Sequence, residues 1–349
     1  MNLNLKDVVV LDRMDFVAPQ TEFTLIYNDA EGIKEKVIPA TVPVKIDGFD
    51  TFVIEDTAGP FLHTSVKVNS VKSFAVAVRN YCSNLFFNVA KPVEFRDSVI
   101  LDVRTFIPNN IAHIMLHILP LCLHVKQSYN AEVTIVLDKL HAPFRKLLEV
   151  FGIHAIFTRR KIQGKFIKVY TTRGLAAHPI MDLFDSSIYA LMPAIYERFQ
   201  FKSGLQETNK IFIARRGQRG VTNLAEVESL LTSLGYKTIF MEDYSIEVQL
   251  GIASEANEIV AIHGASMGML ALRKKISSLI EIMPPNVYHD YFPVTFGHKI
   301  EKHIQIMSYF DQKIPYNGWD TIVKYKSSPF AVDIKQLEMA LNEISTTQS

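Results

Sequence analysis

The sequence has 349 residues, of which 48% are hydrophobic and 21% are charged, a composition typical of a globular protein with about two domains. Its 37 Lys and Arg residues balance 36 Asp and Glu residues, so no overall field draws the chain to nucleic acid or to an acidic membrane. A ligand that carries phosphate therefore needs a local basic pocket. Two cysteines, Cys82 and Cys122, are too few for a disulfide framework and favour a reducing compartment.

The N-terminus predicts no signal peptide, because Asp12, Arg13 and Asp15 interrupt its apolar run. No apolar stretch reaches the length of a membrane span, and the longest, residues 111 to 125, contains three histidines and Pro120. We therefore expect a cytoplasmic protein, with peripheral contact at the inner face of a membrane left open.

The segment before about residue 95 predicts a β-rich start. Alternating apolar residues at 42 to 46, the apolar run 52 to 54 and the valines between 66 and 78 indicate strands. This segment carries no recognisable chemical motif.

Residues 98 to about 172 alternate between predicted strands and helices. The strands cover residues 98 to 101, 133 to 137, 153 to 157 and 166 to 170, and the helices cover 110 to 126 and 143 to 151. Pro120 is expected to kink the first helix or to end its first half.

Residues 211 to 283 repeat this rhythm. Strands are predicted at residues 211 to 214, 237 to 241, 259 to 262 and 278 to 283, with a helix at 245 to 256. Asn223 and Glu226 form a capping-box pattern before another helix, and Gly235 stands where a helix-ending glycine is expected. Residues 332 to 344 form an amphipathic helix, which we expect to pack back across a domain.

Strands that alternate with helices indicate parallel sheets covered on both faces. The fold class is therefore predicted as α/β, with two Rossmann-like domains facing across a cleft. The predicted boundaries are residues 1 to 180, with the β-rich start, then 181 to 330, and a final helix within 331 to 349. Ligands of such sheets bind outside the carboxyl ends of the strands.

Three arginines follow the strand at 211 to 214. Arg215 and Arg216 come directly after it, and Arg219 follows three residues after Arg216. Gly217 directly follows Arg216, and Gly220 directly follows Arg219. Guanidinium groups bind phosphate oxygens through planar, paired hydrogen bonds. The alternative is a solvated basic loop, but the position at a strand end favours phosphate binding.

A turn of small residues follows the strand at 259 to 262. His263, Gly264, Ala265 and Ser266 lead into a helix, where backbone N–H groups and the helix dipole attract an anion. Tight packing is the alternative, and the position two β/α units after the arginines favours anion binding.

Glu281 lies within an apolar strand, where a carboxylate needs partners. Ribose hydroxyls would satisfy it, and so would a basic core residue or a helix N-terminus. The residues alone do not favour either interpretation.

Asn110, His113 and His117 share one helix face by their spacing. Asn110 is a candidate helix cap. The positive helix end disfavours a charged imidazole at His113, and a neutral imidazole suits a general base. The alternative is a core histidine, which we prefer for His117.

His178 and Asp182 are four residues apart, so they could couple on a helix that lines the cleft on the acceptor side; the alternative, which we prefer, is a loop. The chain shows no Asp-x-Asp, no His-Glu-x-x-His and no clustered cysteines, so no metal ligands and no cofactor are predicted. It also lacks the glycine patterns of P-loop and dinucleotide-binding proteins.

Together these residues resemble glycosyltransferase family 61 in order and spacing. The resemblance is carried by Arg215, Arg216, Asn223, Glu226, Gln249, His263, Gly264, Ala265 and Glu281, and upstream by Asn110, His113 and Pro120. It implies a GT-B architecture and sugar transfer from a nucleotide-sugar donor, usually a UDP-sugar, with inversion at the anomeric carbon.

The resemblance also assigns roles. Arg215, Arg216, Arg219, Asn223 and the turn from His263 to Ser266 would hold the donor, with the ribose on Glu281, while His113 and Asn110 would face a glycan acceptor. Because the membrane anchor of eukaryotic members is not found, we expect a bacterial enzyme of surface-polysaccharide synthesis.

Two alternatives remain. One is another sugar-nucleotide enzyme, such as an epimerase. The other is a catalytically silent module that binds glycans or nucleotides, favoured by Ser266 to Met269, where the family usually has Gly-Leu-Thr-Asn.

Overall fold

The computed structural model describes most of the predicted elements. The described residues are 8–9, 16–17, 21–29, 31–41, 45–46, 51–58, 74–75, 78, 81–82, 86–87, 89–94, 99–102, 104, 110–120, 122–123, 126, 132–137, 144–170, 196, 199–217, 219–285, 291–310 and 328–347.

The chain divides into two compact units, and each is built from two stretches of sequence. Unit 1 comprises Met1–Phe16 and Ile46–Leu191, and unit 2 comprises Val17–Lys45 and Met192–Ser349. The sequence places residues 1 to 180 in one domain, whereas residues 17 to 45 belong to unit 2 in the structure. A two-stranded sheet of β2 (Phe16–Val17) and β5 (Lys45–Ile46) lies where the chain leaves unit 1 and returns to it.

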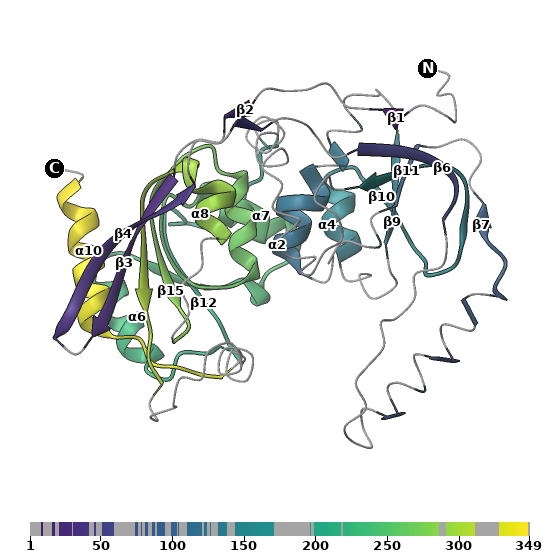
Figure 1. Cartoon of the computed structure of the whole chain (residues 1–349). Coiled ribbons are helices and arrows are strands. Elements are labelled where there is room, and N and C mark those ends of the chain that lie inside the picture. Colours follow the sequence, from purple (N-terminus) through teal and green to yellow (C-terminus); the bar gives the residue numbers. More distant parts are fainter. Residues whose placement is uncertain are drawn as a thin grey trace. The chain divides into compact units, whose positions relative to one another are not determined.

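Unit 1 contains a seven-stranded sheet in the order β1-β6-β11-β8-β9-β10, with β7 also paired to β11 (Figure 1). Its strands are β1 (Val8–Val9), β6 (Thr51–Ala58), β7 (Val93–Glu94), β8 (Val99–Asp102), β9 (Val133–Leu137), β10 (His154–Phe157) and β11 (Ile162–Tyr170). The strands β11, β8, β9 and β10 are parallel, and β6 and β1 continue the sheet in antiparallel fashion. The predicted parallel β/α core is confirmed here, and the β-rich start supplies its antiparallel edge.

The helices of unit 1 follow the prediction with one irregularity. α2 (Ile111–His113) runs into a π-helix, η1 (Ile114–Ile118), in which the Leu119 N–H donates to the Ile114 carbonyl. Pro120 follows directly and has no N–H for the regular ladder, so a changed hydrogen-bond spacing near it is expected. A second helix, α4 (Arg145–Val150), packs against β10.

The strand predicted among the valines between 66 and 78 is wrong where the structure describes it, at residues 74, 75 and 78, and its other residues lie outside the described ones. Phe74, Ala75 and Val78 have helical backbone, although the valines between 66 and 78 predict a strand. The apolar residues Phe74, Val78 and Tyr81 recur at the spacing of a helix face, which competes with the β-branched composition.

Unit 2 contains a seven-stranded sheet in the order β13-β12-β14-β15-β16-β3-β4. Its strands are β3 (Thr21–Asp29), β4 (Gly32–Thr41), β12 (Lys210–Ala214), β13 (Lys237–Phe240), β14 (Glu258–Ile262), β15 (Ile276–Met283) and β16 (Ile300–Met307). All neighbours are parallel except the edge strand β4. The strand order reverses between β12 and β14, as in doubly wound folds.

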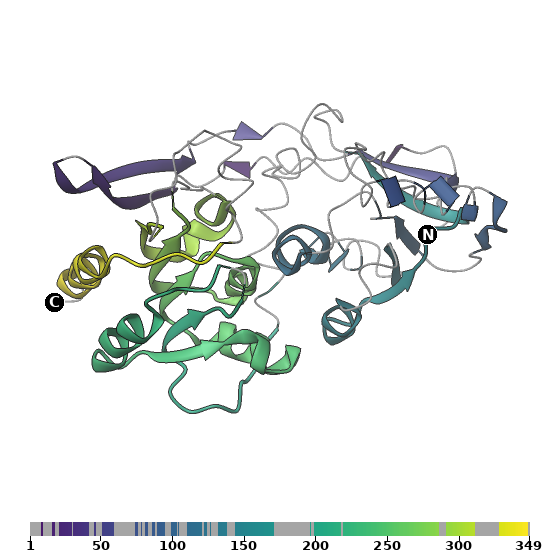
Figure 2. The ribbon, with the colours of Figure 1, turned by 90° about the horizontal axis from the view of Figure 1, so that it is seen from below.

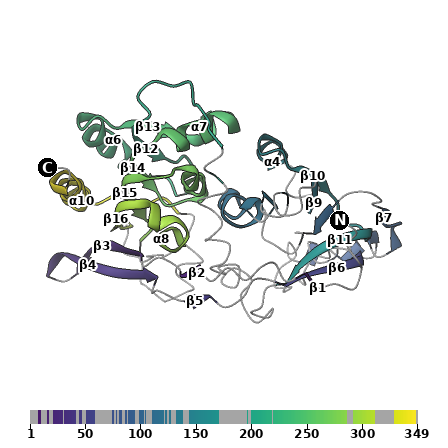
Figure 3. The same ribbon diagram turned by 90° about the horizontal axis from the view of Figure 1, so that it is seen from above.

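Helices cover both faces of this sheet. Figure 3 shows α6 (Leu224–Ser233) and α10 (Ile334–Thr347) on one face, with α7 (Ile246–Glu255) and α8 (Tyr291–Phe296) on the other. Short 3-10 segments, η3 (Met241–Asp243), η4 (Ala265–Leu272) and η5 (Gly297–Lys299), complete the connections. Gly235 ends the helical stretch after α6 with a φ of 83°, as the sequence predicts.

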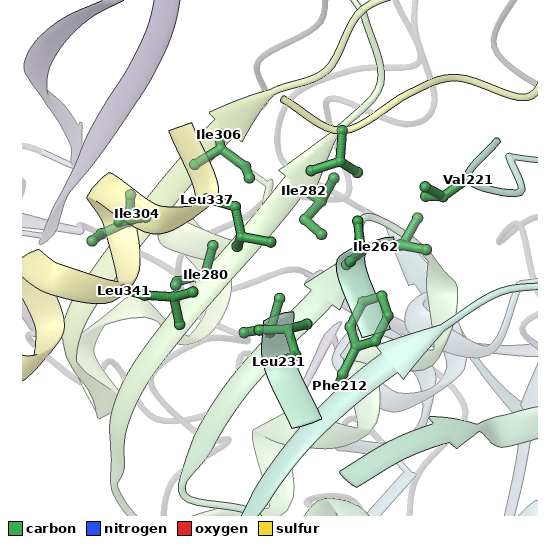
Figure 4. Packing of buried hydrophobic residues seen from close by; sticks show 14 of the residues in the cluster. Phe212, Val221, Leu231, Ile262, Ile280, Ile282, Ile304, Ile306, Leu337 and Leu341 are labelled. Carbon is green, nitrogen blue, oxygen red and sulfur yellow. The ribbon is translucent and has the colours of Figure 1, made fainter. Parts of the chain in front are cut away.

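The core of unit 2 joins segments from both ends of the chain. Alternate side chains of β12, β14, β15 and β16 pack against Leu231 of α6 and Leu337 and Leu341 of α10 (Figure 4). Ile26 of β3 is fully buried in the same cluster. Figure 2 shows the hairpin of β3 and β4, in purple, at the sheet edge beside the C-terminal helix in yellow.

Within the part of the chain that the structure describes, no helix combines the length and the apolar character needed to cross a bilayer.

Candidate functional site

The strand reversal in unit 2 lies between the two segments that the sequence singles out. Arg215 follows the carboxyl end of β12, and His263 and Gly264 follow the carboxyl end of β14. Because β12 and β14 are parallel neighbours, their ends meet at one edge of the sheet. Doubly wound sheets bind ligands in the crevice outside such a reversal, so both segments stand where a ligand is expected.

Two of the three arginines converge on the turn after β14. The Nη1 atoms of Arg215 and Arg219 lie 3.3 Å and 3.4 Å from the carbonyl oxygen of His263 and donate to it. Arg219 reaches this position from a left-handed backbone with a φ of 62°. Two positive charges are thereby gathered at the strand reversal.

Both guanidinium groups belong to partly buried residues. Burial lowers the pKa of Arg215, against the opposing attraction of Glu242, and burial and the charge of Arg215 lower the pKa of Arg219. A guanidinium starts from so high a pKa that both groups stay charged. Their mutual repulsion in a partly dry site is relieved by an anion, and phosphate suits the fork of each group.

Gly264 makes room for this arrangement. A Cβ atom at this position would lie 2.5 Å from Nη1 of Arg215, well inside van der Waals contact. The backbone of Gly264 is extended, with a φ of −178°, so any residue could adopt it. The glycine is therefore needed for the space that the Arg215 side chain occupies.

Arg216 points to a different neighbour. Its exposed guanidinium forms an ion pair with Asp243 and stacks on the ring of Phe240 at 3.8 Å, while its backbone N–H donates to Glu242 at 3.2 Å. The hydrogen bond to Asp243 raises the pKa of Arg216. The structure thus groups Arg216 with the end of β13, apart from the two arginines on the His263 carbonyl.

Ala265 and Ser266 begin η4, which is a 3-10 segment where the sequence predicts a short helix. Both residues are partly exposed. The backbone N–H of His263 donates to the Ile282 carbonyl at 2.9 Å, so the turn is fixed to β15.

Glu281 lies in β15 beneath this turn and is 0% exposed. Its Oε1 is 2.5 Å from Nδ1 of His263, and its Oε2 is 3.1 Å from Nε2 of His303 and 2.9 Å from Nε2 of Gln305. Burial alone raises the pKa of a carboxyl, but the hydrogen bonds and charges of the two histidines outweigh it and lower the pKa of Glu281 to about 2.

In this structure both carboxylate oxygens of Glu281 are bonded to protein groups. This arrangement matches the alternative of a Glu paired with basic core residues. The predicted ribose contact of Glu281 stays a prediction.

His303 and Gln305 are the members of this cluster that the sequence analysis misses. Both lie on β16, and Gln305 stands directly beside Glu281 in the sheet. A signal exists: Ile304 and Ile306 alternate with them, which is the pattern of a strand with one polar face.

Asn223 has a structural partner. Its amide exchanges two hydrogen bonds of 2.9 Å with the backbone of Val332, just before α10, and also donates to Glu226 at 3.2 Å. Asn223 occupies the N-cap position of α6, but its side chain does not cap the helix. The predicted capping box is therefore wrong, because the side-chain oxygen of Asn223 accepts from the backbone N–H of Val332 and not from the first turn of α6.

In unit 1, Asn110 caps α2 as predicted, since its side chain accepts from the Ala112 N–H at 2.8 Å. His113 ends α2 and is partly buried, and this burial lowers its pKa. His113 is therefore neutral near pH 7. The side chain of His117, together with His178 and Asp182, lies outside the described residues.

The described residues contain no group of three or more His, Cys, Asp or Glu side chains that could hold a metal ion. The absence of metal ligands stays a prediction of the sequence.

Unit 2 is therefore a doubly wound α/β unit, and two arginine side chains lie at its strand reversal. Comparison with protein families makes the class specific, because residues 111–279 match the family Glycosyltransferase 61. This match identifies the chain as a glycosyltransferase. The match includes His113, Arg215 and His263 and ends before Glu281. No curated protein matches the sequence.

Proposed function

We propose that this glycosyltransferase binds a nucleotide-sugar donor, most simply a UDP-sugar, at the strand reversal of unit 2. The donor would place its diphosphate against Arg215, Arg219 and the turn from Gly264 to Ser266. The observation that carries this proposal is the convergence of Arg215 and Arg219 on the carbonyl of His263.

The chemistry of the reaction explains why such a site is needed. When an acceptor hydroxyl attacks the anomeric carbon, the bond to the donor oxygen breaks and the diphosphate leaves with an added negative charge. Fixed positive groups at that position stabilise the transition state more than the substrate, and this difference raises the rate.

We further propose that His113 removes the proton of the acceptor hydroxyl, which gives transfer with inversion in one displacement. Its lowered pKa supports this role, because a base must be unprotonated at the working pH. The GT-B arrangement, the glycan acceptor and a part in bacterial surface-polysaccharide synthesis follow from the family resemblance and belong to the same proposal.

The direct test is calorimetric titration of the whole protein with UDP. We expect Arg215→Ala and Arg219→Ala each to weaken binding by about tenfold or more, because each removes a charged hydrogen-bond donor. Lys274→Ala is the matched control, since Lys274 is an exposed cation near the amino end of β15, at the opposite edge of the sheet.

Absence of UDP binding by the wild-type protein would contradict the proposed donor. If both arginine variants bind UDP as tightly as the wild type does, the proposed site is contradicted. Replacement of His113 by Asn separates binding from chemistry. UDP affinity should stay unchanged while transfer falls by about 10²- to 10⁴-fold, as for loss of a general base. UDP binding without any transfer product would favour a silent binding module.

A further inference from the structure

Unit 1 carries an exposed helical stretch, residues 74 to 89, between β6 and β7. Every described residue of this stretch has helical backbone, and the Ala90 N–H donates to the Phe86 carbonyl at 2.9 Å, which is the spacing of an α-helix. Figure 1 shows its described parts, in blue, on a path that leads away from β7.

Exposed apolar side chains are concentrated on this stretch. Among the described residues eight large apolar side chains are exposed, and five of them lie here: Phe74, Val78, Tyr81, Phe86 and Val89. The most open of them, Val89, is 82% exposed. Single exposed apolar residues are ordinary, whereas a group of them on one element marks a surface that binds a partner.

The five side chains share one side of the helix. At about 100° per residue they fall within an arc of about 140° around the axis. Phe87 lies on the opposite side and is partly buried, and the guanidinium of the buried Arg159 lies 5.0 Å from the centre of its ring. One side of the helix therefore faces the body of unit 1, and the apolar side faces solvent.

The end of the exposed stretch is fastened to the sheet of unit 1. The Lys91 carbonyl accepts from Nε of Arg160 at 2.7 Å, and the Val93 N–H donates to the Lys161 carbonyl at 2.8 Å. The strand that follows, β7, pairs with β11. The apolar side is therefore a surface of the folded unit.

The charge of this part of the chain has one sign. The sequence has no Asp or Glu from residue 57 to residue 93. In the same range it has four cations, which are Lys67, Lys72, Arg79 and Lys91. The chain as a whole has a net charge of only +1, so the excess of positive charge is local.

Apolar side chains beside cations, without carboxylates, are the pattern of a helix that lies in the surface of an anionic bilayer. A second copy of the chain fits this surface less well. A two-fold contact brings the same patch of both copies together, so the four cations of one copy would meet the four of the other.

We propose that the exposed stretch docks unit 1 onto an anionic membrane surface. Its five apolar side chains enter the boundary between head groups and acyl chains, and the neighbouring cations contact the lipid phosphates. The helix lies along the membrane surface and does not cross the bilayer. This inference goes beyond the proposed function, because it involves no residue of the donor site.

Cys82 provides a local probe for the experiment. It is exposed and falls within the same arc as the five apolar side chains, while Cys122, the only other cysteine, is buried. The whole protein is labelled at Cys82 with an environment-sensitive fluorophore and mixed with vesicles of phosphatidylcholine and phosphatidylglycerol in equal parts. The emission should shift to shorter wavelength, and a spin-labelled lipid in the vesicles should quench it.

Sedimentation of the unlabelled protein with the same vesicles measures the affinity. Binding should weaken at high salt, because salt screens the attraction between the cations and the lipid phosphates. Vesicles of phosphatidylcholine alone carry no net charge and should bind weakly.

Two pairs of substitutions separate the apolar and the ionic contributions. Phe74→Ser with Phe86→Ser should lower the affinity for the mixed vesicles by about tenfold or more, because two rings no longer leave water. Arg79→Gln with Lys91→Gln should lower that affinity by about tenfold and leave the weak binding to neutral vesicles unchanged.

Tyr309→Ser is the matched control. Tyr309 is also an exposed aromatic residue, but it lies in unit 2. Its replacement should leave vesicle binding unchanged. If Phe74→Ser with Phe86→Ser does not fold, as judged by thermal unfolding, the pair of cation substitutions and the probe on Cys82 still decide the question.

The inference is overturned if the wild-type protein does not sediment with the mixed vesicles, or if it does so without a response at Cys82. An equal loss of binding in Tyr309→Ser would also overturn it. If the wild type binds no vesicles but forms a dimer that Phe74→Ser with Phe86→Ser converts to a monomer, the surface binds a second copy instead. None of these results depends on UDP, so the proposed function stands or falls separately.

Discussion

Gly264 shows how a residue without a side chain can control a charged neighbour. A Cβ atom there would meet the flexible end of Arg215, not the backbone, so the fold can adjust by moving the guanidinium. We predict that Gly264→Ala lowers UDP affinity by about tenfold, like the loss of one charged hydrogen bond, while the melting temperature changes little.

A double-mutant cycle checks this cause. If the alanine acts by displacing Arg215, the pair Gly264→Ala and Arg215→Ala should bind UDP no more weakly than Arg215→Ala alone. Additive losses would instead show that Gly264 contacts the ligand independently. Gly251→Ala provides the contrast, because a Cβ there would lie 2.2 Å from the backbone nitrogen of Ser203, and it should lower the melting temperature.

The sequence identified the arginine loop but did not show which arginine lies at the strand reversal, since Arg215 and Arg216 are adjacent residues of one type. The alternation of side chains between the two faces of β12 does distinguish them. Phe212 and Ala214 belong to the core under α6 and α10, so Arg215 continues the opposite face, which is the face of Glu281. Glu281 itself was recognised as a residue that needs partners, but His303 lies on a strand that was not predicted.

At the scale of elements, Asn223 joins α6 to the segment that leads into α10. Its two hydrogen bonds to Val332 are the kind that a backbone strand would make. We predict that Asn223→Ala lowers the free energy of unfolding by about 1 to 3 kcal/mol, because two buried backbone groups lose their partner.

The effect should be local to α10, whose amide hydrogens should exchange faster with solvent, and UDP affinity should stay near the wild-type value. Glu226→Ala is a suitable control, because it removes only an exposed partner of Asn223. If Asn223→Ala loses UDP binding without losing stability, Asn223 belongs to the donor site, as the sequence predicts.

The elements of the β/α core were predictable because apolar runs and helix signals are local. β12, β14 and β15 were each found from four or more consecutive residues. The pairing of β3 with β16 was not predictable, because the two strands are far apart in the sequence. Nothing within residues 21 to 29 specifies a parallel neighbour near residue 304. The π-helix at Ile114–Ile118 was also missed, although Pro120 marks its position.

At the scale of the whole molecule, the division into two units predicts that a core substitution in one unit destabilises that unit and not the other. Ile26 lies in the first tenth of the sequence but is fully buried in the core of unit 2. We predict that Ile26→Ala destabilises unit 2 by about 2 to 5 kcal/mol, as large-to-small core replacements do. Hydrogen exchange should accelerate in β16 and α10 and stay unchanged in β8 and β9.

Val37→Ala is the control, because Val37 lies on the neighbouring strand β4 and is 53% exposed. It should leave both exchange patterns unchanged. Faster exchange in unit 1 after the Ile26 replacement would mean that the hairpin does not belong to unit 2 alone.

The hairpin of β3 and β4 is synthesised long before β16, the strand with which it pairs. β3 leaves the ribosome early, but its parallel neighbour β16 is among the last strands to be made, so at about 5 to 20 residues per second the nascent hairpin waits for tens of seconds. During that time its inner edge is an unpaired strand that can associate with other chains. Production of this enzyme should therefore depend on chaperones that shield early β-structure until translation has finished.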